Sequence, residues 1–277
     1  MRPETLQVGD LRLEGVSRAG TETWLRVHPP GLAFDAGRGA LPLAGARDLF
    51  LSHGHLDHAL GVPFVLSQRS LHQHAGTRVF CPAPVAGDLA AFVAAAERLE
   101  GADYDFELVG LDPGQRVEVA NAMVVEAFAG DHVVPSLGYH LFRRKKRLRG
   151  DLAGAGRDEL VARREAGEEI TEVVEELALS YVGDAGPGVF DTEPRLFAAE
   201  VLVAECTFIG DELRDKGSLY KHLHLADLAA HAERFRNRAI VLTHLSRRHR
   251  RSELLAEVAR RMPGLAERVH VLLGGET

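Results

Sequence analysis

The stretch Leu49-Phe-Leu-Ser-His-Gly-His-Leu-Asp-His58 begins as an apolar, strand-like segment and ends in the pattern HxHxDH. Three imidazoles and one carboxylate within six positions indicate a metal site, because neutral histidine nitrogen and carboxylate oxygen are good zinc ligands. His53 and His55 are two residues apart, so on an extended loop they point the same way and can share one ion. Asp57 and His58 are adjacent and diverge, which favours a second ion nearby. The alternative is a histidine-rich surface loop without a metal, and further candidate ligands downstream argue against it.

The composition is that of an ordinary globular protein, with 277 residues, 45% hydrophobic and 26% charged. No apolar run reaches the ~20 residues of a membrane span, and the first five residues have no apolar signal core. Cys81 and Cys206 are the only cysteines, which favours a reducing, cytoplasmic location and metal sites built from histidine and aspartate. The net charge of −7 argues against nucleic-acid binding by the whole surface, so a polyanion would need a local basic patch.

Hydrophobic periodicity predicts short strands in both halves of the chain, with helices over 59–74, 84–100, 225–236 and 252–262. Strands dominate each half and helices punctuate them. We therefore expect an α/β fold in which two mixed sheets pack face to face with helices outside, an αββα sandwich. It would form one domain over residues 1–277.

Residues 143–178 differ in character and are predicted to be a surface insertion. The run Arg143–Arg149 holds six basic residues in seven, and eight acids follow within 158–176. One interpretation is a solvated strand edge that charge protects from aggregation. The other is a contact to the phosphate backbone of RNA, remote from the metals. The acids temper the second interpretation, because they could pair with the basic run.

Three more candidate ligands, His132, Asp184 and His244, each follow a predicted strand and precede a turn. Taken singly, each is weak, because a lone histidine at a strand end is usually structural and an aspartate before glycine is usually a turn residue. Ligands on loops at one edge of a sheet are, however, where sites are commonly built. Together with the HxHxDH run they make seven ligands, enough for two zinc ions that share one carboxylate.

The order HxHxDH, His, Asp, His resembles the metallo-β-lactamase superfamily, and further segments resemble its ribonuclease Z branch, in the short form found in plants. These segments are Phe34-Asp-Ala-Gly37, Gly138-Tyr139, Tyr181-Val-Gly-Asp184, Val203-Ala-Glu-Cys-Thr-Phe208 and Thr243-His-Leu-Ser-Arg-Arg248. The chain departs from the usual pattern at Arg38, Ala185, Lys221 and His249, where the branch commonly has Glu, Thr, Gly and Tyr. The resemblance covers nearly the whole chain.

The resemblance implies a metal-binding role for each of the seven side chains. His53, His55 and His132 would hold the first zinc, Asp57, His58 and His244 the second, and Asp184 would bridge them. Two such ions ~3.5–4 Å apart can supply hydroxide at neutral pH. Mn²⁺ or Fe²⁺ can compete for the same ligands.

Further roles follow from the resemblance. Asp57 would also handle the proton of the attacking water. The leaving oxygen would receive a proton from His222, supported by Glu205, with His224 as the rival acid because the sequence offers His-Leu-His. Asp35 would orient a metal ligand from behind.

The implied activity is that of an endoribonuclease that removes 3′ trailers from precursor tRNA by metal-hydroxide attack. Six residues are expected to contact substrate, namely Tyr139, Arg144, Lys145, Lys146, Ser246 and Arg248. A homodimer is expected, with its interface on the helix over 59–74, where Phe64, Val65 and Leu71 exceed what one core needs. Two alternatives stay open: a small-molecule hydrolase on the same fold (a cyclic phosphodiesterase, sulfatase or thioester hydrolase), and a metal-stabilised binding protein.

Overall fold

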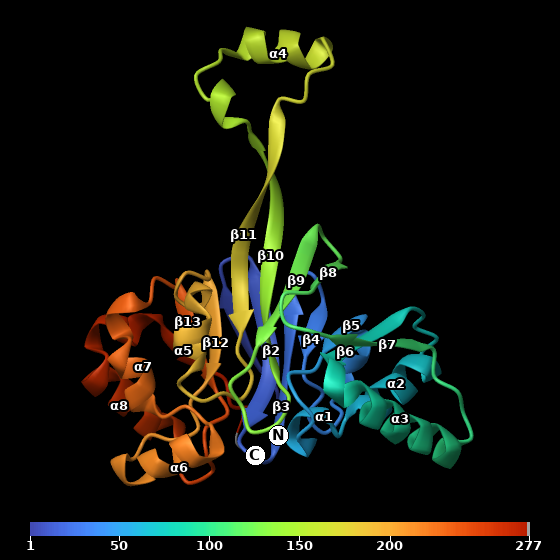
Figure 1. The fold of residues 1–277 in the computed structure, drawn as a ribbon, viewed down its shortest axis with the longest axis vertical. Helices are drawn as coiled ribbons and strands as arrows, with labels where there is room; N and C mark the ends of the chain where they lie inside the picture. Colours follow the sequence, from blue (N-terminus) through green and yellow to red (C-terminus); the bar gives the residue numbers. More distant parts are fainter. Residues whose placement is uncertain (276–277) are drawn as a thin grey trace.

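Two seven-stranded sheets form the body of the molecule, and the computed structural model describes residues 1–275 (Figure 1). The first sheet runs in chain order: β1 (Glu4–Val8), β2 (Leu11–Arg18), β3 (Glu22–His28), β4 (Leu32–Phe34), β5 (Asp48–Phe50), β6 (Thr77–Pro82) and β7 (Phe106–Leu111). The second has the order β14 to β8: β14 (Val269–Val271), β13 (Ala239–Thr243), β12 (Val201–Glu205), β11 (Thr171–Tyr181), β10 (Leu137–Leu148), β9 (Met123–Ala129) and β8 (Arg116–Val119). Each sheet is mixed: β1 to β4 and β8 to β11 pair antiparallel, and β4 to β7 and β11 to β14 pair parallel.

The sheets face each other across an aromatic core. Phe34 and Phe50 of the first sheet meet Tyr139 and Tyr181 of the second, and the rings of Phe34 and Tyr181 stack with centroids 4.7 Å apart. Burial of these large rings is the main favourable term that holds the layers together.

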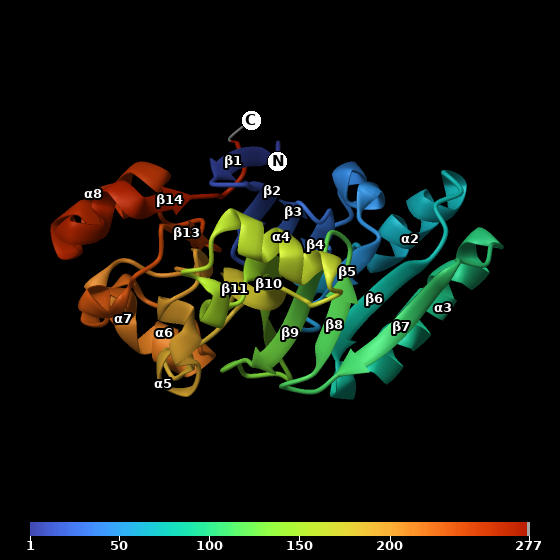
Figure 2. The same ribbon diagram turned by 90° about the horizontal axis from the view of Figure 1, so that it is seen from above.

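Helices cover the outer faces of both sheets, which confirms the expected αββα sandwich (Figure 2). Their bounds are α1 (Leu56–Ala59), α2 (Val62–Leu71), α3 (Ala86–Glu100), α4 (Arg157–Glu165), α5 (Val189–Thr192), α6 (Arg214–Tyr220), α7 (Leu225–Ala230) and α8 (Arg251–Arg261). None of the helices in the described residues has the length and apolar character that a membrane crossing requires.

The prediction of one helix over 59–74 is wrong in detail, because α1 ends at Ala59, Leu60 and Gly61 form a turn, and α2 covers only Val62–Leu71. The amide of Gly61 donates to the backbone oxygen of Gly37, and a side chain at position 61 would collide with the backbone of Ala36 and Gly39. The Gly61 amide is therefore bonded outside the helical segment, and the close packing there requires glycine. Val65 lies in the core, so it does not belong to an exposed face as we expected, whereas Phe64 and Leu71 are exposed.

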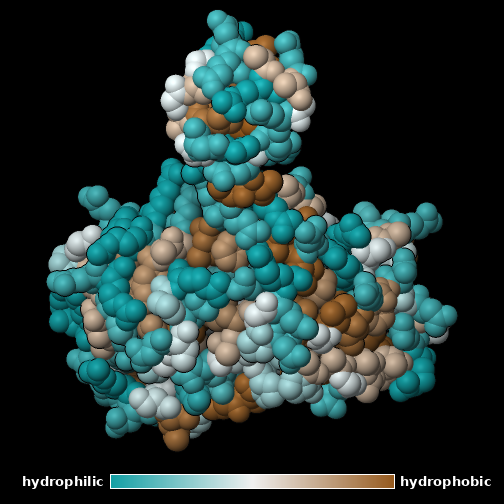
Figure 3. Space-filling view, turned by 45° about the horizontal axis from the view of Figure 1, so that its top comes forward, coloured by the Kyte–Doolittle hydropathy of each residue, from teal (hydrophilic) through white to brown (hydrophobic). Residues whose placement is uncertain are grey.

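The predicted insertion is an extension of two core strands. β10 and β11 continue beyond the body as a long hairpin, and α4 lies at its tip (Figure 1). We name residues 143–178 the arm. The part around α4 at its tip stands clear of the body and has a mostly hydrophilic surface (Figure 3).

Most of the basic run Arg143–Arg149 lies on β10, opposite acidic residues of β11. The structure therefore shows the pairing between the basic run and the acids that the sequence allowed. Arg144 lies 3.0 Å from Glu175, and Lys145 lies 2.7 Å from Glu176. Lys146 lies 3.9 Å from Glu169, at the limit of an ion pair. Cross-strand pairs of opposite charge stabilise a ladder that has little core beneath it.

Candidate metal centre

Loops from both sheets meet at the end of the body opposite the arm, where α1 and α6 lie (Figure 1). The carboxyl ends of parallel strands lie at one edge of a sheet, and β5, β11, β12 and β13 each lead into one of these loops. The structure brings all seven expected ligands to this point. Three groups have ligand atoms within 4.8 Å of one another: His53, His55, His132 and Asp184; Asp57, His58 and His244; and Asp184, Glu205, His222 and His244.

Asp35 lies behind two of the histidines, as expected for a residue that orients ligands. Its carboxylate lies 2.8 Å from His58 Nδ1 and accepts hydrogen bonds from the hydroxyls of Ser52 (2.8 Å) and Tyr181 (2.6 Å). Ser52 Oγ also lies 3.0 Å from His53 Nδ1, and because it donates to Asp35 it accepts from that ring. Both rings are thereby fixed with Nε2 toward the centre, the arrangement that tunes histidine for a metal.

Two of the other three histidine ligands, His132 and His244, are fixed in the same way. His132 Nδ1 donates to the backbone oxygen of Lys221 at 3.1 Å. His244 Nδ1 lies 3.0 Å from Thr207 Oγ1, which donates its own proton to Glu205 at 2.5 Å. The Nε2 atoms of His132 and His244 are left to face the other ligands. The sequence analysis did not predict that Ser52, Thr207 and Lys221 support the histidines. Ser52 and Thr207 lie inside the motifs that it used, whereas the only signal at Lys221 was that the family commonly has glycine there.

The donor set fits a divalent cation. Nε2 of His53 is buried and has no hydrogen-bond partner within the described residues, a cost that a bound cation would remove. Burial, with the charge of His58 beside it, holds the pKa of His53 well below its usual value, so the ring is neutral and able to coordinate. Burial alone would raise the pKa of Asp184, but His244 and His58 outweigh it and lower that pKa well below the usual range. An ionised, buried carboxylate beside imidazole nitrogens suits a divalent metal, whose charge can replace that of the protonated rings.

The backbone is strained at three positions around the centre. Asp35, Lys221 and His244 have φ angles of 56°, 52° and 57°, in the left-handed region that non-glycine residues rarely adopt. Each such residue costs about 1–3 kcal/mol and persists only where its surroundings hold it. Asp35 and His244 follow directly after β4 and β13, and Lys221 follows α6 and directly precedes His222.

Glu205 and His222 form the expected pair beside the ligands. His222 Nδ1 lies 2.8 Å from Glu205 Oε1, which also accepts from the backbone N–H of Ala185 at 3.0 Å. Burial alone would lower the pKa of His222, but the Glu205 carboxylate outweighs it and raises that pKa to about 9. His222 is therefore protonated at neutral pH and can donate a proton.

His224, the other candidate for the acid, has a structural role. His224 is buried and caps the start of α7, where Nδ1 accepts from the backbone N–H of Ala226 at 3.0 Å. Its Nε2 lies 3.0 Å from the backbone oxygen of Gly210. Both nitrogens are thus occupied away from the metal ligands, which leaves His222 as the candidate acid.

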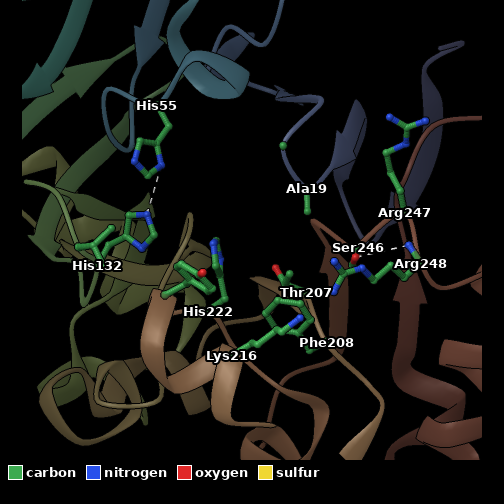
Figure 4. Close-up of a pocket in the computed structure, with 13 residues that line it drawn as sticks. Ala19, His55, His132, Thr207, Phe208, Lys216, His222, Ser246, Arg247 and Arg248 are labelled. Carbon is green, nitrogen blue, oxygen red and sulfur yellow. Dashed lines mark hydrogen bonds between the residues drawn. The ribbon is translucent and has the colours of Figure 1, made fainter. Parts of the chain in front are cut away.

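An open cavity of about 470 Å³ adjoins the centre (Figure 4). Its walls include His55, His132 and His222, and also the cations Lys216, Arg247 and Arg248. Within residues 1–275 these three cations have no ion-pair partner, so they are available to an anionic ligand.

The structure sorts the six expected substrate contacts into three groups. Ser246 and Arg248 line the cavity. Tyr139 does not, and the prediction for it is wrong: the ring is fully buried between the sheets and its hydroxyl donates to the backbone oxygen of Leu51 at 2.6 Å. It anchors the strand that enters the HxHxDH loop. Arg144, Lys145 and Lys146 lie on the arm, at the other end of the molecule (Figure 1).

Comparison with known proteins agrees with this geometry. Residues 37–245 match the family model described as a β-lactamase superfamily domain. The chain is 30% identical to tRNase Z TRZ1 of Arabidopsis thaliana over 277 residues, which cover 99% of both chains. Among solved structures, the metallo-β-lactamase fold protein YhfI from Bacillus subtilis has a TM-score of 0.61 at 14% identity, covering 94% of this chain and 95% of the other. The short form of human tRNase Z has a TM-score of 0.53 at 21% identity, covering 86% and 87%.

The fold and the ligand set thus define a metallo-β-lactamase-type metal site. Within that superfamily, the chain belongs to the ribonuclease Z family.

Proposed function

We propose that the protein is a metal-dependent endoribonuclease that removes 3′ trailers from precursor tRNA. The observation that carries the proposal is an open cavity, bordering the cluster of seven candidate metal ligands, that is lined by His222, which pairs with Glu205, and by three cations without an ion-pair partner among residues 1–275. Relatives that match the chain along its full length are named tRNase Z, which agrees with an RNA phosphodiester as the substrate.

We propose two zinc ions, with Mn²⁺ or Fe²⁺ as competitors for the same ligands. The first would be held by His53, His55 and His132, the second by Asp57, His58 and His244, with Asp184 shared between them. Such ions, when bound, lower the pKa of water and neutralise charge that develops on a phosphate.

The protein's own groups would handle the protons and the position of the substrate. Asp57 is partly exposed beside His244 and would accept the proton of the attacking water. His222 would donate its proton to the leaving 3′ oxygen of the tRNA, and Glu205 would stabilise the charged ring before transfer. Arg248 would hold the phosphate, and Ser246 beside it would add a hydroxyl. The products are a tRNA with a 3′-hydroxyl and a trailer with a 5′-phosphate.

The arm would contact the RNA far from the reacting phosphate. Arg144 and Lys145 are paired with acids, so RNA phosphates would have to compete with those carboxylates for them. Lys146 is the most exposed of the three and the least tightly paired, which makes it the best placed for a backbone contact.

A homodimer and a cytoplasmic location stay predictions. Exposed apolar side chains on or near α1 and α2, namely Leu41, Leu56, Leu60 and Phe64, support an interface close to the one expected.

The test compares a large and a small substrate of the metal-loaded protein. One is a precursor tRNA with a 3′ trailer, and the other is bis(p-nitrophenyl) phosphate. We expect cleavage at the discriminator base and slow turnover of the small diester. An arm-deleted variant, in which Asn-Gly replaces residues 145–174, should lose tRNA cleavage and keep diester turnover. Diester turnover by the full chain with the tRNA left intact would overturn the proposal in favour of a small-molecule hydrolase.

A further inference from the structure

Asp131, next to the ligand His132, joins two loops of the metal centre. Its backbone oxygen accepts from the amide of Gly186 at 2.7 Å, and its carboxylate accepts from the amide of Gly188 at 3.1 Å. A Cβ atom at Gly186 or Gly188 would lie 2.8 or 2.7 Å from that carboxylate, so only glycine allows the contact. Both glycines follow the ligand Asp184 in the chain, so Asp131 ties the His132 loop to the Asp184 loop.

Lys221 brings in a third loop. Its Nζ lies 2.7 Å from the Asp131 carboxylate, and its backbone oxygen accepts from His132 Nδ1 at 3.1 Å. It also directly precedes His222, the candidate acid. Its φ of 52° is one that glycine adopts without strain, and members of the family that the chain resembles commonly have glycine here. In this chain a lysine is held in that conformation, and its side chain makes a contact that glycine cannot make.

We propose that Lys221 and Asp131 are positioning residues that bind the His132, Asp184 and His222 loops into one unit. Metal retention by His53, His55 and His132 and the orientation of His222 would then depend on the same ion pair. The inference rests on the metal-dependent hydrolysis proposed above, but not on RNA being the substrate. Because the Lys221 and Asp131 side chains are 46% and 26% exposed, their ion pair contributes little to global stability. Its effect should therefore appear at the metal centre and not in the unfolding temperature.

The experiment measures metal affinity and turnover in Lys221→Met, Asp131→Asn and the double variant. Zn²⁺ affinity is measured by competition with a chromophoric chelator, and kcat and KM with bis(p-nitrophenyl) phosphate. Each single variant should bind the ion of the His53–His55–His132 set about tenfold more weakly, as is typical when a partner behind a ligand is removed. At saturating Zn²⁺, kcat should fall by a similar factor while KM stays within about twofold, because the variants misplace His222 and leave the phosphate site intact. The double variant should resemble the single ones, since both remove one interaction.

Three further variants separate positioning from folding and from charge. Lys221→Gly relieves the backbone strain, so it should fold at least as well as the parent and still lose metal affinity. Lys221→Arg, which keeps the charge, should recover part of that affinity. Arg98→Met removes one exposed positive charge from α3, far from the centre, and should change neither quantity.

Unchanged metal affinity in Lys221→Met, or additive losses in the double variant, would overturn the proposal. A protein that binds Zn²⁺ and hydrolyses the diester but leaves precursor tRNA intact would refute the proposed substrate alone. The ion-pair inference would still be decided by the affinities.

Discussion

The two ends of the β10–β11 hairpin have the same backbone pairing but are stabilised by different side chains. At the inner end the residues of Leu137–Leu141 and Ala178–Tyr181 are buried, and their apolar side chains, such as those of Tyr139 and Tyr181, lie between the sheets; both segments adjoin the ligand loops. At the outer end Arg143–Leu148 faces Thr171–Glu176, and ion pairs replace the apolar core. Burial gives the inner end the rigidity that ligand placement requires. Half-exposed ion pairs keep the outer end extended at a much smaller gain in free energy.

The largest effect is expected at the loop that follows the inner end. Asp184→Asn removes the negative charge shared by the metal ligands, and kcat/KM should fall about 10³–10⁴-fold with loss of bound metal, since metal chemistry supplies several kcal/mol. Turnover with bis(p-nitrophenyl) phosphate and metal analysis check this. A variant that keeps both metal and rate would show that the inner end does not support the chemistry.

The next effect separates the two neighbouring histidines. His222→Ala should lower kcat about 10²–10³-fold while bound metal is unchanged, because only a proton donor is lost. The matched control, His224→Ala, removes a helix cap and should cost about 1 kcal/mol of stability with little change in kcat. Larger loss of rate in the control would reverse the assignment of the acid.

Core packing at the inner end should dominate the stability of the hairpin. Leu141 is fully buried between the sheets, so Leu141→Ala should lower the free energy of unfolding by about 2–5 kcal/mol. Urea denaturation of the metal-free protein measures this. A cost near zero would mean that the inner end does not depend on its core.

Acid should weaken the inner end through His140. This buried ring lies 2.7 Å from Ser180 Oγ; burial and the charge of Arg195 lower its pKa to about 4, although Glu193 raises it. The unfolded chain takes up the proton near pH 6.5, so stability should fall as the pH drops from about 6.5 to 4, by up to about 3 kcal/mol, and then level off. The decline should be smaller in His140→Gln by that amount. Parallel declines in the two proteins would contradict this.

The smallest effect is expected at the outer end. Arg144→Gln breaks ion pairs with Glu118 and Glu175 but should change the free energy of unfolding far less than Leu141→Ala does, because water and salt screen exposed charges. The same urea experiment applies, and high salt should reduce the difference further. A cost comparable to that of Leu141→Ala would mean that the two ends are not stabilised differently after all.

The sequence was most informative where chemistry restricts residue type. In a chain with so few cysteines, metal ligands have to be histidine or carboxylate, so the seven candidate ligands that the structure brings together could be expected, and Asp35 with them. The prediction that Tyr139 contacts substrate is wrong, because a sequence motif does not show which face of a strand a side chain occupies. The pairing of Arg144 with Glu175 depends on hairpin register, and that of Lys221 with Asp131 joins positions 90 residues apart. Such contacts leave no local pattern.

The two sheets are also contiguous in the chain, since β1 to β7 end at Leu111 and β8 begins at Arg116. The first half supplies His53 to His58 and the second supplies His132, Asp184 and His244. During synthesis the first layer can therefore form before any partner for its ligand loop has left the ribosome. His244 follows β13, which is among the last strands to be synthesised, so the ligand set is complete only after β13 has joined its sheet. Metal binding by the full ligand set would therefore indicate that both halves have folded and docked.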